Sequence, residues 1–402
     1  MRSSTASTTF SPLRLTLLWF GVQLAWGALL GISLQARTSA FNPGHAFDAF
    51  RTISVPGALA AAITQLVMGP WSDALRRNGS RRLWFYGAGA IVGAMAVVVF
   101  YVAPTFAWLI AAYVAVQISF NIIIGPYQAA IPDFVEGPRI GVASGWTAAM
   151  QSGGNAAGAI LATLLGNSPI LGAAIAVSVL ACATGTIAYL RDVPLQPVVK
   201  DQRLAMSGSL VNLFVSRAFV YTGFYTLLGY LFFYVSSIVP KGFPLNATMA
   251  SGVCILLFTV VGAVGAAVAA KPADRLDERV VVSIGGAVVT LGIVAMAVLP
   301  TIAVVPVAIV CAGLGWGVFL CADWAFACRV LPNGALASAM AIWNIAVVGP
   351  QMLAPLLATA VIAKLGALSS NAGPRDAFLL ASSEILIGAA WIWRLPRRSM
   401  GK

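Results

Sequence analysis

The sequence predicts an all-α membrane protein whose twelve transmembrane helices form two pseudo-symmetric six-helix bundles. Three observations predict this fold. The 402 residues are 60% hydrophobic and only 9% charged, with a mean hydropathy of +0.91, whereas a soluble protein carries about a quarter charged residues. Long apolar segments recur along the whole chain. The Lys and Arg residues lie mostly in the connections on one predicted side of the membrane.

Twelve apolar segments are long enough to cross a bilayer, which takes about 20 residues in a helix. The first follows a polar N-terminal stretch and is too long for a signal-peptide core, so we expect it to be retained. The predicted spans are 13–36, 49–69, 83–103, 106–128, 142–166, 169–190, 210–238, 247–269, 280–299, 303–327, 336–362 and 377–393.

The charges orient these spans. With the N-terminus in the cytosol, 19 of the 24 Lys and Arg residues fall on the cytosolic side and 5 on the other. Short cytosolic loops carry such an excess in membrane proteins. We therefore expect a multi-pass protein of the inner membrane with both termini in the cytosol.

The longest interior polar segment separates two halves of similar length. It covers 191–209, contains two prolines and mixed charges, and reads as a cytosolic linker. The predicted domains are a bundle at 1–190, the linker at 191–209 and a bundle at 210–402.

An internal repeat relates the two halves. The connection after the second span contains Asp73, the connection after the eighth contains Asp274, and each aspartate is followed two residues later by leucine. Two related six-span halves are an architecture of transporters that hold their substrate between repeats.

The segment from Gly69 to Arg82, GPWSDALRRNGSRR, resembles the G-x-x-x-D-R-x-G-R-R signature of the major facilitator superfamily. Ala74 stands where the signature has an arginine, and the second copy has Ala270 in place of its glycine. The resemblance implies an interdomain charge network that closes the cytosolic side. The gating residues that it implies are Gly69, Asp73, Arg81, Arg82, Asp274 and Arg275. The alternative is a solvated loop without a gating role.

Segments 125–135, 216–235 and 321–358 resemble a bacterial branch of that superfamily near the sucrose-type and glycoside–pentoside–hexuronide symporters. The resemblance implies that the first, fourth, seventh and tenth spans line a central cavity, with contributions from the second, fifth, eighth and eleventh. Spacings of four and seven residues place polar side chains on shared helical stripes. The candidate substrate-binding residues are Gln23, Trp26, Gln117, Asn121, Gln151, Asn155, Tyr221, Tyr225, Asn344 and Gln351.

Amides with paired donors and acceptors, together with rings that have a polar tip, suit a neutral, hydroxyl-rich solute. The alternative for each amide is a hydrogen bond that ties two helices together. Three ionisable residues inside the spans are candidates for ion coupling, because such residues are expensive in a bilayer. They are Asp323, Glu384 and Arg217. A structural ion pair with Arg329 or Arg217 is the alternative for Asp323, and a structural hydrogen bond is the alternative for Glu384. Arg217 is either that partner or a cation whose side chain extends to the membrane surface.

The leading function is a proton-coupled or facilitative transporter for a small neutral polar solute, with a sugar or glycoside as one class. The alternatives are an efflux carrier for amphipathic compounds and a non-transporting membrane protein that uses the fold for assembly or sensing. An enzyme fits poorly, because the chain has one histidine and shows neither a catalytic triad nor paired carboxylates. We expect a monomer in the lipid bilayer with no cofactor, no metal site and no nucleic-acid partner.

Overall fold

The computed structural model describes residues 10–135, 139–197, 208–240, 242–330, 336–366 and 373–395, which form helices joined by short connections. Several helix starts follow from local sequence. Ser168 and Thr105 each accept a hydrogen bond of 3.3 Å from the backbone N–H three residues later, at Leu171 and Trp108. Such capping satisfies N–H groups that the first helical turn leaves without partners.

The first half of the chain, termed here the N-half, contains six long helical segments, the first of which consists of three consecutive elements. Its elements are α1 (Pro12–Ala28), η1 (Leu29–Ser33), α2 (Leu34–Phe41), α3 (Ala46–Arg77), α4 (Leu83–Val102), α5 (Phe106–Tyr127), α6 (Ala130–Phe134), α7 (Ile140–Leu165) and α8 (Pro169–Asp192).

The second half, termed the C-half, also contains six long helices. Its elements are α9 (Gly208–Ile238), α10 (Ala247–Arg275), α11 (Glu278–Val298), α12 (Val305–Val330), α13 (Leu336–Gly366), α14 (Pro374–Trp391) and η3 (Ile392–Arg394). Eleven helical segments among the described residues are long and apolar enough to cross a membrane. With the 26-residue α7 they make the predicted twelve, which confirms the predicted fold class.

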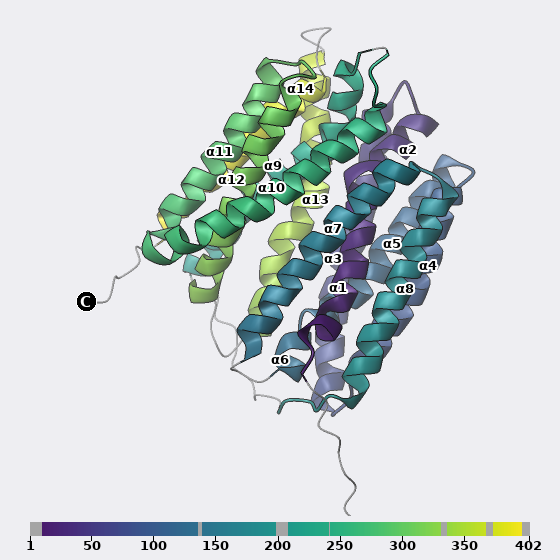
Figure 1. Ribbon diagram of the computed structural model, residues 1–402, viewed down its shortest axis with the longest axis vertical. Coiled ribbons are helices and arrows are strands. Elements are labelled where there is room, and N and C mark those ends of the chain that lie inside the picture. Colours follow the sequence, from purple (N-terminus) through teal and green to yellow (C-terminus); the bar gives the residue numbers. More distant parts are fainter. Residues whose placement is uncertain are drawn as a thin grey trace, which may run out of the picture.

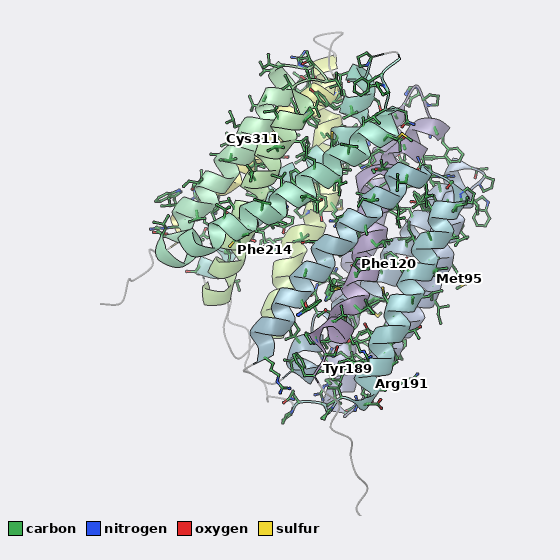
Figure 2. All side chains as sticks on the ribbon, viewed as in Figure 1. Met95, Phe120, Tyr189, Arg191, Phe214 and Cys311 are labelled. Atoms are coloured by element: carbon green, nitrogen blue, oxygen red, sulfur yellow. The ribbon has the colours of Figure 1, made fainter. Side chains whose placement is uncertain are left out.

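The helices of each half pack mainly against one another. In the N-half, α1 contacts α7 and α8, while α4 contacts α5 and α8. In the C-half, α12 contacts α10 and α11, while α14 contacts α9 and α11. Figure 2 shows the labelled Phe120 within the N-half and the exposed Met95 on its outer side. Apolar side chains on the outside are expected for a surface that faces lipid.

An even number of spans places the start of α1 and the end of α14 at the same end of the bundle, which we call the terminal end. The opposite end, with residues 42–45, is called the distal end. Figure 1 shows the purple-to-teal N-half and the green-to-yellow C-half close together towards α2 at the top and diverging towards the bottom, where α6 lies. The halves therefore approach each other most closely at the distal end.

The contacts between the halves explain this approach. Phe47 and Phe50 of α3 pack edge-on against Phe233 of α9, with ring centroids 5.1 and 5.8 Å apart. Gly252 of α10 lies so close to Thr163 of α7 that any side chain at position 252 would collide with the threonine. Aromatic contacts and a glycine at the closest approach thus close the distal end.

Three features differ from the predicted spans. α3 continues through Gly69 and Asp73 to Arg77, and α10 continues to Arg275, so most of both predicted signature loops is helical. The extra turns extend past the apolar region, which is why hydropathy placed the helix ends earlier. The first span contains a π-helical turn at 29–33, and the short helix α6 follows α5. Neither had a signal in the hydropathy pattern.

Candidate functional site

A pocket lies between the two halves, towards the distal end. Its cavity volume is about 30 Å³, and the pocket is partly open to solvent. The N-half contributes residues from η1, α2, α3 and α5, and the C-half contributes residues from α9 and α13. The lining residues are Leu30, Leu34, Gln35, Phe50, Ser54, Tyr113, Tyr225, Leu228, Gly229, Gln351 and Pro355.

Two of the predicted substrate-binding residues meet in this pocket. The Nε2 group of Gln351, on α13, donates a hydrogen bond of 2.9 Å to the hydroxyl of Tyr225, on α9. Pro350 and Pro355 flank this region of α13, and a proline inside a helix removes a backbone hydrogen bond and bends the helix. The C-half side of the pocket therefore presents a tyrosine and an amide.

A chain of polar side chains extends from the pocket into the N-half. Gln65 of α3 donates to Oδ1 of Asn121, and the Nδ2 of Asn121 donates to the backbone carbonyl of Gln117 at 2.7 Å. The Nε2 of Gln117 then donates to the hydroxyl of Tyr113 at 2.8 Å. Gln117 is 1% exposed. The predicted pair of amides on α5 is thus buried and connected to the pocket through Tyr113.

The predicted residues on α1 and α7 lie at a tight contact between these two helices. A Cβ atom at Gly154 would lie 3.0 Å from Cβ of Gln23, and one at Gly27 would lie 2.7 Å from Oδ1 of Asn155. Trp26 packs edge-on against Phe120 at 5.2 Å. Gln23, Asn155 and Gln151 are each half-buried, and these four predicted residues are absent from the lining of the pocket.

Tyr221 belongs to a buried charged cluster of the C-half. Arg217 of α9 forms an ion pair with Asp323 of α12, and its guanidinium also donates to the hydroxyl of Tyr221 at 3.2 Å. Asp323 is 3% exposed. Of the two partners considered for Asp323, the structure shows Arg217. The side chains of the remaining predicted residues on the long helices, Asn344 on α13 and Asp274 and Arg275 on α10, lie outside the described residues.

A second charged cluster lies at the terminal end of the N-half. Arg82 donates to Oδ2 of Asp133 at 2.7 Å and contacts Asp73 at 2.7 Å. Arg76 contacts the other carboxylate oxygen of Asp133 at 3.2 Å. Burial lowers the pKa of Arg82, but the carboxylates of Asp133 and Asp73 outweigh that effect and hold the pKa above its usual value.

The other two predicted gating residues of this region lie beside the cluster. Arg81 donates to the backbone carbonyls of Leu190 and Val193, the latter at 2.8 Å. Gly69 has open space at its Cβ position. The partners that the structure gives Asp73, Arg81 and Arg82 all belong to the N-half, so these contacts tie together the terminal ends of α3, α4, α6 and α8.

Glu384 lies on α14 and is 4% exposed. Its Oε2 accepts a hydrogen bond of 3.1 Å from the hydroxyl of Thr226 on α9, while Oε1 has no partner among the described residues. This bond joins α14 to α9. It is the structural hydrogen bond expected as the alternative to a coupling role for Glu384.

Four residues of these sites were absent from the predicted set. Gln35 and Ser54 line the pocket, Gln65 extends the amide chain, and Asp133 joins the two arginines. A lone amide within the apolar second span was a usable signal for Gln65. Asp133 lies in a polar connection, where sequence does not reveal a tertiary partner.

Comparisons with known proteins agree with this architecture. Residues 15–355 match the profile of the family described as Major Facilitator Superfamily. No curated protein matches the chain. A bacterial homologue of the human lysosomal transporter Spinster, in an inward-facing and occupied conformation, is similar with a TM-score of 0.75 at 14% identity, over 95% of each chain.

Two other solved structures have similar folds. One is a POT family transporter in complex with 5-aminolevulinic acid, with a TM-score of 0.72 at 11% identity over 95% of each chain. The other is the nucleoside transporter NupG, with a TM-score of 0.69 at 13% identity over 95% of this chain and 99% of that one. At these identities the likeness concerns the fold, whereas the family profile covers most of the sequence. The chain belongs to the Major Facilitator Superfamily, a family of membrane transporters.

Proposed function

We propose that the chain moves a small neutral polar solute across the membrane by alternating access, with sugars and glycosides as the leading solute class. The observation that carries this proposal is the pocket between the halves. Both halves contribute hydroxyl and amide groups to it, and its eleven lining residues carry no formal charge. A solute held by groups from both halves is released when the halves rock against each other.

The chemistry of the pocket favours a neutral solute over an ion. Amide and phenol groups supply both donors and acceptors at short range, and the described lining offers neither a cation for a carboxylate nor an anion for an amine. A charged solute entering this pocket would lose its hydration without a counter-charge, which is costly.

The conformation fits one stage of this cycle. Contacts of Phe47 and Phe50 with α9 close the distal end, while the halves diverge towards the terminal end (Figure 1). In the predicted orientation the terminal end faces the cytosol and the chain lies in the inner membrane. With this orientation, closure at the distal end supports our proposal of an inward-facing state, in a carrier that we propose to be a monomer.

Energy coupling by protons forms part of this proposal. Asp323 with Arg217 and Glu384 are the ionisable groups that the described spans offer for it, and both sites lie within the C-half. The buried pair and the hydrogen bond to Thr226 also serve packing, so an experiment must separate the two roles.

The test uses purified protein in detergent and in liposomes. A thermal-shift screen with D-glucose, D-xylose and myo-inositol should raise the melting temperature for at least one of them. Uptake of that solute should follow a pH gradient if protons drive it, or only its own gradient if transport is facilitative. Gln351→Ala should weaken the uptake, whereas the lipid-facing Met95→Ala should leave it unchanged. Absence of solute-dependent stabilisation and of counterflow would contradict the proposal.

The aromatic cluster of the C-half favours a second candidate, an efflux carrier for amphipathic compounds. The rings of Phe224 and Trp316 stack at 4.1 Å with an interplanar angle of 9°, and Tyr221 and Phe258 pack beside them. Flat rings accept large apolar solutes without directional bonds. Stabilisation by tetraphenylphosphonium, without stabilisation by any sugar, would select this candidate.

A further inference from the structure

We propose that Gln35 and Ser54 form a hydroxyl-binding subsite at the distal end of the pocket and set its selectivity for hydroxyl-bearing solutes. This inference rests on the proposed function and specifies where one group of the solute binds. Both residues line the pocket, on α2 and α3. Gln35 is 1% exposed and Ser54 is 6% exposed. Neither Oε1 of Gln35 nor Oγ of Ser54 has a hydrogen-bond partner among the described residues.

The backbone around Gln35 fixes how its amide is used. In the π-helical turn 29–33 the N–H of Leu34 bonds to the carbonyl of Leu29, five residues earlier, so the normal helical pairing is shifted. The Nε2 of Gln35 donates a hydrogen bond of 2.7 Å to the carbonyl of Leu30. It also lies 3.5 Å from the carbonyl of Leu228 on α9. The NH₂ end of the amide is thus engaged by both halves of the molecule.

The other end of the amide remains for a ligand. An amide oxygen can accept two hydrogen bonds, and a buried polar atom without a partner is uncommon in a folded protein. With Nε2 held by backbone carbonyls, the amide cannot turn over without losing those bonds. Oε1 is therefore a fixed, buried acceptor on a residue that lines the pocket.

Ser54 departs from the pattern of its own helix. Thr52 and Thr64 of α3 each donate their hydroxyl to the carbonyl four residues earlier, at Asp48 and Ala60, at 2.7 Å. This is how hydroxyl groups in membrane helices usually satisfy themselves. Ser54 lies between them on α3 and does not form that bond. Its hydroxyl is available both to donate and to accept.

The tyrosines of the pocket complete the set of groups. The hydroxyls of Tyr113 and Tyr225 accept hydrogen bonds from Gln117 and Gln351, and each still carries its own proton as a donor. The pocket thus combines a fixed acceptor at Gln35 with hydroxyl groups from both halves. An alcohol group matches this set, since it can donate to Gln35 and accept from Ser54 at the same time.

Selectivity follows from the same groups. A site that hydrogen-bonds a hydroxyl rejects an analogue without it strongly, because the buried groups of the site then stay unpaired. A purely apolar pocket does not discriminate in this way. The subsite therefore predicts that removal of one hydroxyl from a bound sugar weakens binding markedly.

The experiment measures equilibrium binding and melting temperature for wild type, Ser54→Ala and Gln35→Met. The probes are D-galactose and D-fucose, which differ by one hydroxyl, followed by D-glucose, D-xylose and myo-inositol. The control variant is Thr64→Val, which removes a hydroxyl from the same helix away from the pocket. Ser54→Ala breaks no hydrogen bond of the protein, so its ligand-free melting temperature should equal or exceed that of wild type.

Both pocket variants should bind the preferred sugar about tenfold more weakly, with the control unchanged. Their preference for the sugar over an analogue lacking one hydroxyl should shrink by a similar factor. Gln35→Met removes the donor to the carbonyls of Leu30 and Leu228 and could unfold the protein. In that case sugar binding by Ser54→Ala and Ser54→Cys tests the subsite. Sugar binding at wild-type strength in the Ser54 variants would show that Ser54 does not bind the solute, and would overturn the two-residue subsite while the proposed function stands. Failure of every probe to bind wild type would overturn the proposed solute class and the subsite together.

Discussion

Arg82, directly before α4, and Arg76 of α3 hold the two carboxylate oxygens of Asp133, with N–O distances of 2.7 and 3.2 Å. Arg82 and Arg76 are 5% and 7% exposed. This three-residue cluster fixes α6 against the terminal ends of the two helices. Because the cluster is buried, its carboxylate matters more for stability than a carboxylate in a surface ion pair does.

We expect Asp133→Asn to lower the free energy of unfolding by about 3 kcal/mol, because the buried Arg76 loses its counter-charge and Arg82 keeps only the partly exposed Asp73. Thermal unfolding of the purified protein measures the effect. Asp48→Asn is the matched control, since the pair of Asp48 with Arg51 is largely exposed and such pairs contribute about 0.5 kcal/mol. Equal melting temperatures for the two variants would contradict the structural role of Asp133.

The buried pair of Arg217 with Asp323 supports a second prediction. Arg217→Gln and Asp323→Asn should each destabilise the protein, and the double variant should recover about 2 kcal/mol relative to the sum of the two. The reason is that each single change leaves one charge buried without its partner. Chemical or thermal unfolding of the four proteins in the cycle provides the measurement.

The same double variant tests the coupling role of Asp323. If the pair is structural, the folded double variant should keep uptake that responds to a pH gradient. Folded protein that exchanges solute but has lost its response to the gradient would instead assign proton coupling to Asp323.

Much of the fold follows from the sequence because the bilayer leaves few options. Each span needs a long apolar run with its backbone bonds satisfied internally, so the twelve segments and their order are visible in hydropathy. The ends of α3 and α10 were placed too early because Asp73 and Asp274 lie on helical turns beyond the apolar region. Amphipathic extensions of this kind read as loops in a hydropathy profile.

The site was predictable only where a polar residue stands in the middle of an apolar span. Gln117, Tyr225 and Gln351 were found this way and lie in or next to the pocket. Gln35 was missed because it stands near the end of its span, where an amide is ordinary. Its importance arises from the π-helical turn and from the carbonyl of Leu228 in the other half, and neither can be read from local sequence.

Glu384 provides a third prediction. Glu384→Gln should leave solute exchange within about twofold of wild type, because a glutamine oxygen can still accept the hydrogen bond from Thr226. Counterflow in proteoliposomes measures the exchange. The matched variant Thr226→Val removes the other side of the same bond and should destabilise the protein slightly without changing the response to a pH gradient. Loss of all transport by a folded Glu384→Gln protein would instead make this carboxyl part of the transport cycle.

The distal closure supports the last prediction. Phe50 packs against Phe233 and Tyr230 of α9, and its ring lies 3.0 Å from where a Cβ atom at Gly229 would stand. Phe50→Ala removes the ring that fills this interface, so the distal end should open more often. A Phe→Ala truncation in a packed site costs about 3–5 kcal/mol, and only the part of this cost that depends on the contact with α9 weakens closure.

The opening can be measured by labelling a cysteine placed at the pocket residue Leu34, in a protein whose native cysteines have been replaced. A membrane-impermeant maleimide applied from the distal side should modify Leu34→Cys slowly alone and about tenfold faster with Phe50→Ala. Phe106→Ala, which truncates an aromatic residue within the N-half, is the control and should leave the rate unchanged. Because the rate depends on the population of the distal-open state, an unchanged rate with Phe50→Ala would mean that the aromatic contacts do not hold the distal end closed.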